Sequence, residues 1–157
     1  MFRRTRSAVF RLALKLLADG KSTGGVPGKN RTFSKSLRRA LSGILFTFLN
    51  ERNFRFECAA AALAVIAALA FRISRLEWAL LWLNIFFVLA MEAKNTSLEL
   101  TTDIATKEYD YGAKSSKDAS SGSVLLAALS AAVTGLLIFG PRLVALSRTI
   151  VSYLPNR

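Results

Sequence analysis

The sequence predicts an all-α membrane protein with three transmembrane helices, preceded by one or two amphipathic helices on the membrane surface. Apolar residues make up 52% of its 157 residues, and three stretches without charge stand out, 58–71, 78–91 and 119–141. The formal net charge is +12, and a chain both basic and apolar is typical of a small membrane protein with basic cytoplasmic flanks. It has no His and one Cys, Cys58, which excludes histidine bases, intrachain disulfides and cysteine-cluster zinc sites.

The N-terminal region is expected to lie on the membrane rather than to cross it. Residues 1–18 mix basic and apolar side chains in the manner of a helix bound to an anionic membrane surface. Residues 22–32 contain Gly and Pro and predict a linker, after which apolar residues recur at helical spacing as far as Asn50. We therefore expect an N-terminal extension and linker over 1–32, a membrane domain over 33–141 and a C-terminal tail over 142–157.

The three uncharged stretches predict the spanning helices. A bilayer is crossed by about 20 apolar residues, and the 23 residues of 119–141 are long enough. The other two stretches have 14 residues each, but they continue in helical phase into partly charged sequence, 53–57 before the first and 92–103 after the second. A helix can span while its polar end faces other helices or water. The connection 72–77 then predicts a tight hairpin between antiparallel helices.

The distribution of basic residues predicts the orientation. With three spans, the N-terminal region and the segment 92–118 share one side of the membrane, and together they carry 17 Lys and Arg residues against 5 on the other side. Basic residues concentrate on the cytoplasmic side of membrane proteins. The N-terminus and the segment 92–118 are therefore expected in the cytoplasm, and the C-terminus outside.

A polar stripe begins where the second apolar stretch ends. Its members lie at offsets of 3, 4, 7 and 11 from the first, which places them along one side of a helix: Glu92, Asn95, Thr96, Glu99 and Asp103. A carboxylate in the hydrocarbon costs about 2.5–3.5 kcal/mol on insertion scales, so it needs a partner or a function. Carboxylates seven residues apart with an amide between them can hold Mg²⁺ through oxygen ligands and leave one acid free as a base. The alternative is a solvated helix end.

Two further clusters lie at the same predicted face. Glu51 and Arg55 precede the first span and are spaced to pair across one helical turn, although taken alone they are better explained as an interfacial cap with arginines that reach toward water. Lys114, Lys117 and Asp118 share a face at the entrance to the last span, where lysines can neutralise phosphates while the acid holds a metal. Together the clusters supply what phosphoryl transfer requires, which is mostly positioning and charge neutralisation.

The combined pattern resembles the signature of the prokaryotic diacylglycerol kinases and undecaprenol kinases. The residues that carry the resemblance are Glu92-x-x-Asn95-Thr96-x-x-Glu99-x-x-x-Asp103, Ala113-Lys114-x-x-Lys117-Asp118-x-x-x-Gly122, Asn50-Glu51-x-x-Phe54-Arg55 and Glu77-Trp78. The resemblance implies a lipid kinase domain over 33–141 in a bacterial inner membrane protein. It also implies a homotrimer with active sites shared between subunits, whose substrates are Mg-ATP and a membrane lipid alcohol, diacylglycerol or undecaprenol, and no nucleic-acid partner is expected.

The same resemblance assigns roles to individual residues. Glu92 matches the general base that takes the proton of the lipid hydroxyl, and Glu51 and Glu99 match the acids that bind the catalytic Mg²⁺. Asn95 matches the amide that lies between those two acids. Lys117 and Asp118 match residues that contact or position the nucleotide, and Asp103 and Glu57 match acidic positions near it.

Two other classes of protein remain as alternatives. A small transporter could relay protons through Glu92 and Glu99, which predicts ion-coupled flux without ATP but leaves Lys117 and Asp118 unexplained. A non-enzymatic membrane anchor could act through its basic N-terminus, which predicts that deletion of residues 1–30 abolishes function while substitution of Glu99 does not.

Overall fold

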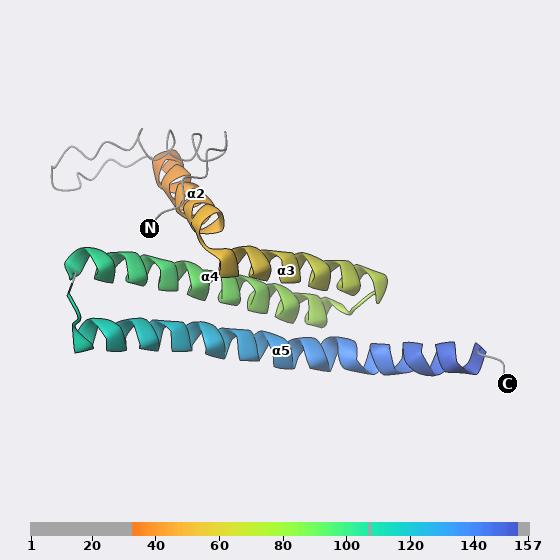
Figure 1. The fold of residues 1–157 in the computed structure, drawn as a ribbon. Helices are drawn as coiled ribbons and strands as arrows, with labels where there is room; N and C mark the ends of the chain where they lie inside the picture. Colours follow the sequence, from red (N-terminus) through yellow and green to blue (C-terminus); the bar gives the residue numbers. More distant parts are fainter. Residues whose placement is uncertain (1–32, 107, 154–157) are drawn as a thin grey trace. The chain divides into compact units, whose positions relative to one another are not determined.

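The computed structural model describes residues 33–106 and 108–153, and all regular structure in them is helical. The helices are α2 (Phe33–Asn50), α3 (Arg52–Ala70), α4 (Arg75–Ala105) and α5 (Tyr111–Tyr153), coloured along the chain in Figure 1. Three of them, α3, α4 and α5, are long and apolar enough to cross a membrane. The predicted fold class is therefore confirmed, while the helix expected over 1–18 and its linker lie outside the described residues.

Contacts divide the chain into two units, 1–55 and 56–157. In the first unit, α2 is the predicted amphipathic helix and ends at Asn50 as expected; its exposed apolar side chains recur every three or four residues, at Leu37, Leu41, Ile44 and Phe48. The Arg55 guanidinium donates hydrogen bonds to the carbonyl oxygens of Phe48 and Leu49, at 3.3 and 3.0 Å. A cation at the C-terminus of a helix satisfies free carbonyl groups and complements the helix dipole.

The pair of Glu51 with Arg55 that their spacing allows does not form. Glu51 lies between α2 and α3 rather than within a helix, and its backbone N–H donates to the Thr47 carbonyl oxygen at 2.8 Å. The two residues therefore lack the single helical turn that the pairing required, and Arg55 binds the end of α2 instead.

In the second unit, α3 and α4 form the hairpin that the short connection predicted. Arg72 adopts a left-handed conformation with φ of 49°, and the N–H of Ile73 donates to the Ala68 carbonyl oxygen, which closes the end of α3. Ser74 then caps α4 in a reciprocal arrangement: its hydroxyl accepts from the N–H of Glu77, and its own N–H donates to the Glu77 carboxylate. Both helix ends are thus satisfied within a four-residue turn.

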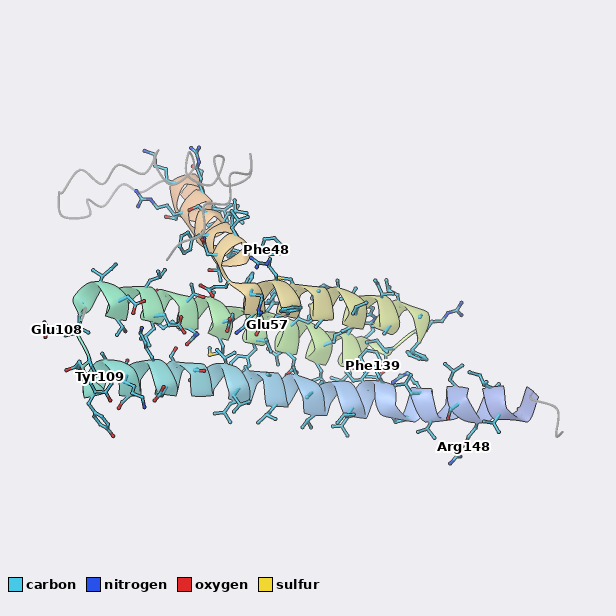
Figure 2. All side chains as sticks on the ribbon, viewed as in Figure 1. Phe48, Glu57, Glu108, Tyr109, Phe139 and Arg148 are labelled. Atoms are coloured by element: carbon cyan, nitrogen blue, oxygen red, sulfur yellow. The ribbon has the colours of Figure 1, made fainter. Side chains whose placement is uncertain are left out.

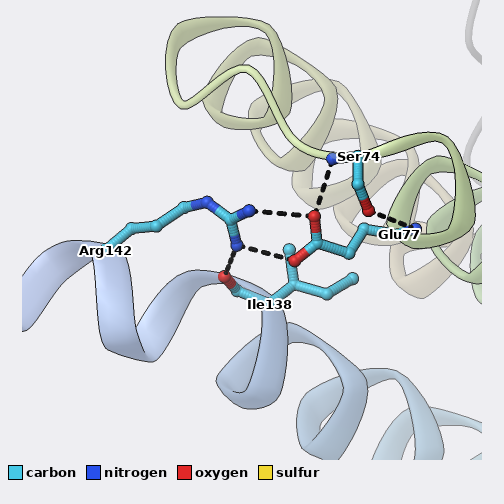
Figure 3. Close-up of polar contacts among 4 residues, drawn as sticks. All are labelled: Ser74, Glu77, Ile138 and Arg142. Carbon is cyan, nitrogen blue, oxygen red and sulfur yellow. Dashed lines mark hydrogen bonds and ion pairs between the residues drawn. The ribbon is translucent and has the colours of Figure 1, made fainter.

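Glu77 also joins this turn to α5. Figure 3 shows the Arg142 guanidinium donating two hydrogen bonds of 2.8 Å to the two carboxylate oxygens of Glu77, while Arg142 also donates to the Ile138 carbonyl oxygen. Behind the pair lies a small apolar core formed by Ala68, Ile73, Leu81 and Ile138. The bidentate pair and the core together fix one end of the three-helix unit.

We expect Glu77→Gln and Arg142→Met each to lower the thermal unfolding temperature, because each leaves the other group half-buried without its partner. The double variant should be no less stable than either single variant, since no unpaired charge then remains. Thermal unfolding of the four proteins in detergent measures this. Additive losses in the double variant would show that the two side chains stabilise the fold independently.

The last helix is longer than the sequence predicted. The 119–141 stretch was expected to end at Pro141, but α5 passes through this residue and continues to Tyr153. A proline inside a helix lacks its own N–H, and its ring crowds the carbonyl group four residues earlier, which favours a bend but leaves the hydrogen bonds on either side in place. The neighbouring hydrogen bonds of α5 carry the helix on.

The helix α4 packs against α5 along one continuous buried face. Its buried residues are Leu81, Asn84, Val88, Glu92 and Thr96. Halfway along, the Asn84 amide donates to Thr134 Oγ1 at 3.2 Å and accepts from Ser130 Oγ at 2.9 Å. These bonds hold α4 and α5 together in the apolar part of the unit, where polar groups find partners only on other helices. The last two residues of this buried face, Glu92 and Thr96, are also the first and third members of the polar stripe.

Candidate functional site

The polar stripe of α4 is formed as predicted, and its first members are the most deeply buried. Glu92 and Thr96 are each 3% exposed, and the Thr96 hydroxyl donates to the Glu92 carbonyl oxygen at 3.0 Å. One turn further, the Asn95 amide donates to Glu99 Oε1 at 2.9 Å. Asp103 lies exposed near the end of the helix, about 16 Å from Glu92 along its axis at the usual helical rise. The stripe thus runs from a shielded carboxylate to an open helix end.

Glu57 brings a second acid from α3 to the buried end of the stripe. Its carboxylate lies close enough to Glu92 for their charges to interact. Glu57 Oε2 is buried, yet it makes no hydrogen bond within the described part of the chain. Because an unpaired buried polar atom costs free energy, an oxygen in this state indicates a site built to receive a further group.

An apolar cavity of about 300 Å³ begins at Glu57 and extends between α3, α4 and α5. In Figure 2 Glu57 lies on α3, and Phe139, another lining residue, lies on α5. Most of the wall is apolar, with Ala residues from α3 and α5, and its polar lining is Glu57, Asn84 and Thr134. The acid of α3 therefore borders both the stripe and an apolar space.

The exposed end of the stripe opens on a charged pocket of about 380 Å³ between the end of α4 and the start of α5. Lys117 forms an ion pair across this pocket with Asp103, and Lys114 pairs with Asp118 along α5 at 3.3 Å. The connection between the helices, with Glu108 and Tyr109, contributes to the wall (Figure 2). Because Lys117 pairs with Asp103, the last member of the stripe, the predicted Lys114, Lys117 and Asp118 lie at the exposed end of the stripe.

The donor atoms at the stripe suit a hard divalent cation. Glu99 supplies carboxylate oxygens, and the neighbouring Asn95 Oδ1 is buried without a hydrogen-bond partner among the described residues. Carboxylate and amide oxygens are the ligands that Mg²⁺ takes from proteins. However, within 33–106 and 108–153 no three acidic or thiol side chains are grouped closely enough to hold a metal by themselves. Glu51 belongs to the first unit, so its place beside Glu99 stays a prediction.

Two polar features of this unit were missed by the sequence analysis. The bonds of Asn84 to Ser130 and Thr134 could have been anticipated, because Asn84 interrupts an apolar stretch and the two hydroxyls are four residues apart in another. The pairing of Glu77 with Arg142 had no signal in the spacing, since the two residues lie 65 positions apart in the sequence.

Comparison with known proteins connects this site to one family. A family model described as prokaryotic diacylglycerol kinase matches residues 38–139. The chain is 39% identical over 111 residues to the undecaprenol kinase of Bacillus subtilis (strain 168), which covers 71% of this chain and 90% of that protein. It is 33% identical over 112 residues to a diacylglycerol kinase of Synechocystis, covering 71% of this chain and 64% of that protein. The diacylglycerol kinase of Escherichia coli (strain K12) is 30% identical over 92 residues, 59% of this chain and 75% of that protein. With its three spanning helices and its buried acidic stripe, the chain belongs to the prokaryotic diacylglycerol kinase family of membrane lipid kinases.

Proposed function

We propose that the protein transfers the γ-phosphoryl group of ATP to the hydroxyl group of a membrane lipid, diacylglycerol or undecaprenol, at the stripe of α4. The observation that carries the proposal is the position of Glu92, which is 3% exposed and begins a row of polar side chains leading to a charged pocket. One helix thus connects an acid shielded by protein with a pocket suited to phosphates. A lipid hydroxyl and a nucleotide can meet along it without passing through the hydrocarbon.

Glu92 acts as the general base. Its carboxylate takes the proton of the lipid hydroxyl as the oxygen forms a bond to the γ-phosphorus, and the bond from that phosphorus to the β,γ-bridging oxygen breaks to release ADP. The Glu57 carboxylate lies close enough to Glu92 for the two groups to interact, so Glu57 borders the place proposed for the lipid hydroxyl. The lipid then leaves as its phosphate monoester.

Glu51 and Glu99 would hold Mg²⁺, and Asn95 would orient Glu99 through its hydrogen bond. When bound, Mg²⁺ supplies positive charge that offsets the phosphate oxygens. One observation supports this set: Asn95 Oδ1, beside Glu99, is buried without a hydrogen-bond partner among the described residues and can accept a further contact. In the homotrimer that the family resemblance implies, an acid from a neighbouring subunit would complete the site.

Lys117 and Asp118, with Asp103, Asn95 and Glu57, bind and position ATP. In the structure the ammonium group of Lys117 contacts Asp103. The phosphates of ATP compete with Asp103 for this ammonium, and Lys117 then offsets the charge that builds on the transferred group. Asp103 keeps Lys117 at the mouth of the pocket until the nucleotide arrives.

Lys117→Met should raise the KM for ATP by about 10-fold and lower kcat as well, because the ammonium contacts the phosphates both before and during transfer. Lys117→Arg keeps the charge and should retain more activity than the Met variant. Initial rates at varied ATP in lipid micelles measure both constants. A Met variant with unchanged KM and kcat would remove Lys117 from the nucleotide site.

The membrane setting of the proposal follows from charge and length. The basic side chains concentrate before the first span and around the α4–α5 connection, which supports a cytoplasmic position for the N-terminus and the charged pocket in the proposed bacterial inner membrane protein. ATP is present on that side. Residues 33–141 form the kinase domain, the extension 1–32 precedes it, and residues 142–157 follow it.

Undecaprenol is the favoured acceptor, because the relative with that activity in its name shares 39% identity over 90% of its length. The test uses purified protein with labelled ATP in micelles supplemented with undecaprenol or with diacylglycerol. Faster transfer with undecaprenol supports the assignment, and a rise with diacylglycerol alone reverses it. Absence of transfer to either lipid, with ATP and Mg²⁺ supplied, would overturn the kinase proposal.

A further inference from the structure

The last turns of α5 extend beyond the rest of the three-helix unit. Arg142 pairs with Glu77 in the first turn of α4, which marks the level of the α3–α4 turn on α5. The helix then continues to Tyr153, about 16 Å further at the usual helical rise. Figure 1 shows this end of α5 passing the α3–α4 turn without another described helix of its unit beside it. Its side chains therefore need a partner outside the described fold, or water.

The projecting segment is amphipathic. Leu143, Leu146 and Ile150 follow one another at helical spacing on one side, and Val144 and Val151 lie next to them. All five are between 47% and 66% exposed. The opposite side carries Arg148, Thr149 and Ser152. Such a division, with a basic residue on the polar face, is the pattern of a helix that lies in a membrane interface.

The hydroxyl groups of the segment have hydrogen-bond acceptors within the helix itself, so they do not need water to accept their protons. Ser147, Thr149 and Ser152 each donate a hydrogen bond to a carbonyl oxygen of their own helix, at 2.9, 3.1 and 2.7 Å. After Asp118 the sequence contains no Asp or Glu, and Arg142 is paired with Glu77, so the charge that the segment adds is the positive charge of Arg148. A helix with these properties suits the boundary between acyl chains and anionic headgroups.

If α5 stayed straight and perpendicular to the membrane, the apolar side chains of the segment would not reach the boundary between acyl chains and headgroups. The headgroup layer on each side of the hydrocarbon is about 5–8 Å thick, so a perpendicular helix would carry Ile150 and Val151 through it into water. Gly140 and Pro141 stand directly before the segment. Glycine disfavours the helical conformation and proline removes a hydrogen bond, so the helix bends most easily here.

We propose that residues 143–153 form a surface anchor, for which α5 bends near Gly140–Pro141 while Arg142 keeps its pair with Glu77, and which lays its apolar face in the headgroup region of the bilayer. The occupant of this face is the protein's own membrane, because the segment continues directly from a candidate span whose Leu136 and Leu137 are 72% and 73% exposed. The family match ends at residue 139, so the anchor lies outside the matched residues. It does not rest on the proposed catalytic mechanism.

Site-directed spin labelling of the full chain tests the anchor. Single Cys residues replace Leu143 and Ile150 on the apolar face, and Arg148 and Ser152 on the polar face, in a Cys58→Ser background. Each labelled protein is placed in vesicles of phosphatidylethanolamine and phosphatidylglycerol, and label access to oxygen, which dissolves in lipid, is compared with access to a water-soluble nickel chelate. A label at Leu136, inside the span, is the lipid-exposed control.

The anchor predicts a several-fold higher oxygen-to-nickel ratio at 143 and 150 than at 148 and 152, with Pro141→Ala raising nickel access at 143 and 150 because it straightens the helix. Equal nickel access at all four positions would mean that the segment stands in water. Low access to both reagents at 143 and 150 would mean that protein covers them, and unchanged access in the Pro141→Ala protein would mean that no bend occurs there. Each of these three results overturns the proposal.

Discussion

Glu92→Gln should lower kcat by about 100-fold or more, because an amide cannot accept the proton of the lipid hydroxyl. The side chain is 3% exposed, and glutamine has nearly the same shape, so the packing between α4 and its neighbours is retained. The KM for ATP should change little, because the role proposed for Glu92 is with the lipid hydroxyl rather than with the nucleotide. Initial rates with labelled ATP in lipid micelles measure both constants.

Thr101→Ala is the matched control for this experiment. Thr101 lies on the opposite side of α4, is exposed, and donates its hydroxyl only to the carbonyl oxygen of Ser97. This variant should keep the activity of the parent protein. If Glu92→Gln also transferred phosphate at close to the parent rate, Glu92 would not be the base.

The second large effect is expected at Glu99. Glu99→Gln should raise the Mg²⁺ concentration for half-maximal rate by at least about 10-fold and lower the maximal rate, because a neutral amide binds a hard cation more weakly than a carboxylate. Asn95, which donates to Glu99 at 2.9 Å, can also pair with the new amide, so the fold tolerates the change. Rates across a Mg²⁺ titration measure the shift.

Glu99→Asp, which keeps the charge on a shorter side chain, should fall between the parent and the Gln variant. Binding of Mn²⁺, followed by its paramagnetic resonance signal, separates a loss of metal affinity from a slower chemical step. If the Mg²⁺ dependence of Glu99→Gln were unchanged, Glu99 would not be a metal ligand. This result would not affect the role proposed for Glu92, which is tested separately.

Much of the fold could be predicted from sequence because its signals are local. The apolar stretches, the helical spacing up to Asn50 and the short connection before Glu77 each depend on neighbouring residues, and the structure contains the corresponding helices and hairpin. The polar stripe was predictable for the same reason, since one helix carries all five of its members. The family match over 38–139 agrees with the motifs that first indicated it.

The remainder depends on contacts between helices, which spacing along one helix does not reveal. The spacing of Glu51 and Arg55 allows a pair across one helical turn, but the break between α2 and α3 at Glu51 removes that turn. The last span was predicted over 119–141, yet α5 continues through Pro141 to Tyr153, because an interior proline can bend a helix without ending it. The bond between Arg142 and Glu77 arises only once α4 and α5 lie antiparallel.

The hydrogen bonds of Asn84 have a consequence for the chemistry two turns away. Asn84 and Glu92 share one uninterrupted helix, and Asn84 is bonded to both Ser130 and Thr134 on its neighbour. Sliding α4 along α5 by a single residue, or rotating it by the corresponding angle, would break both bonds at once. The two hydrogen bonds of Asn84 therefore set the position of Glu92 along α5 and its rotation about the axis of α4. A conservative substitution at Asn84 can thus lower the rate of the proposed phosphoryl transfer through the position of Glu92.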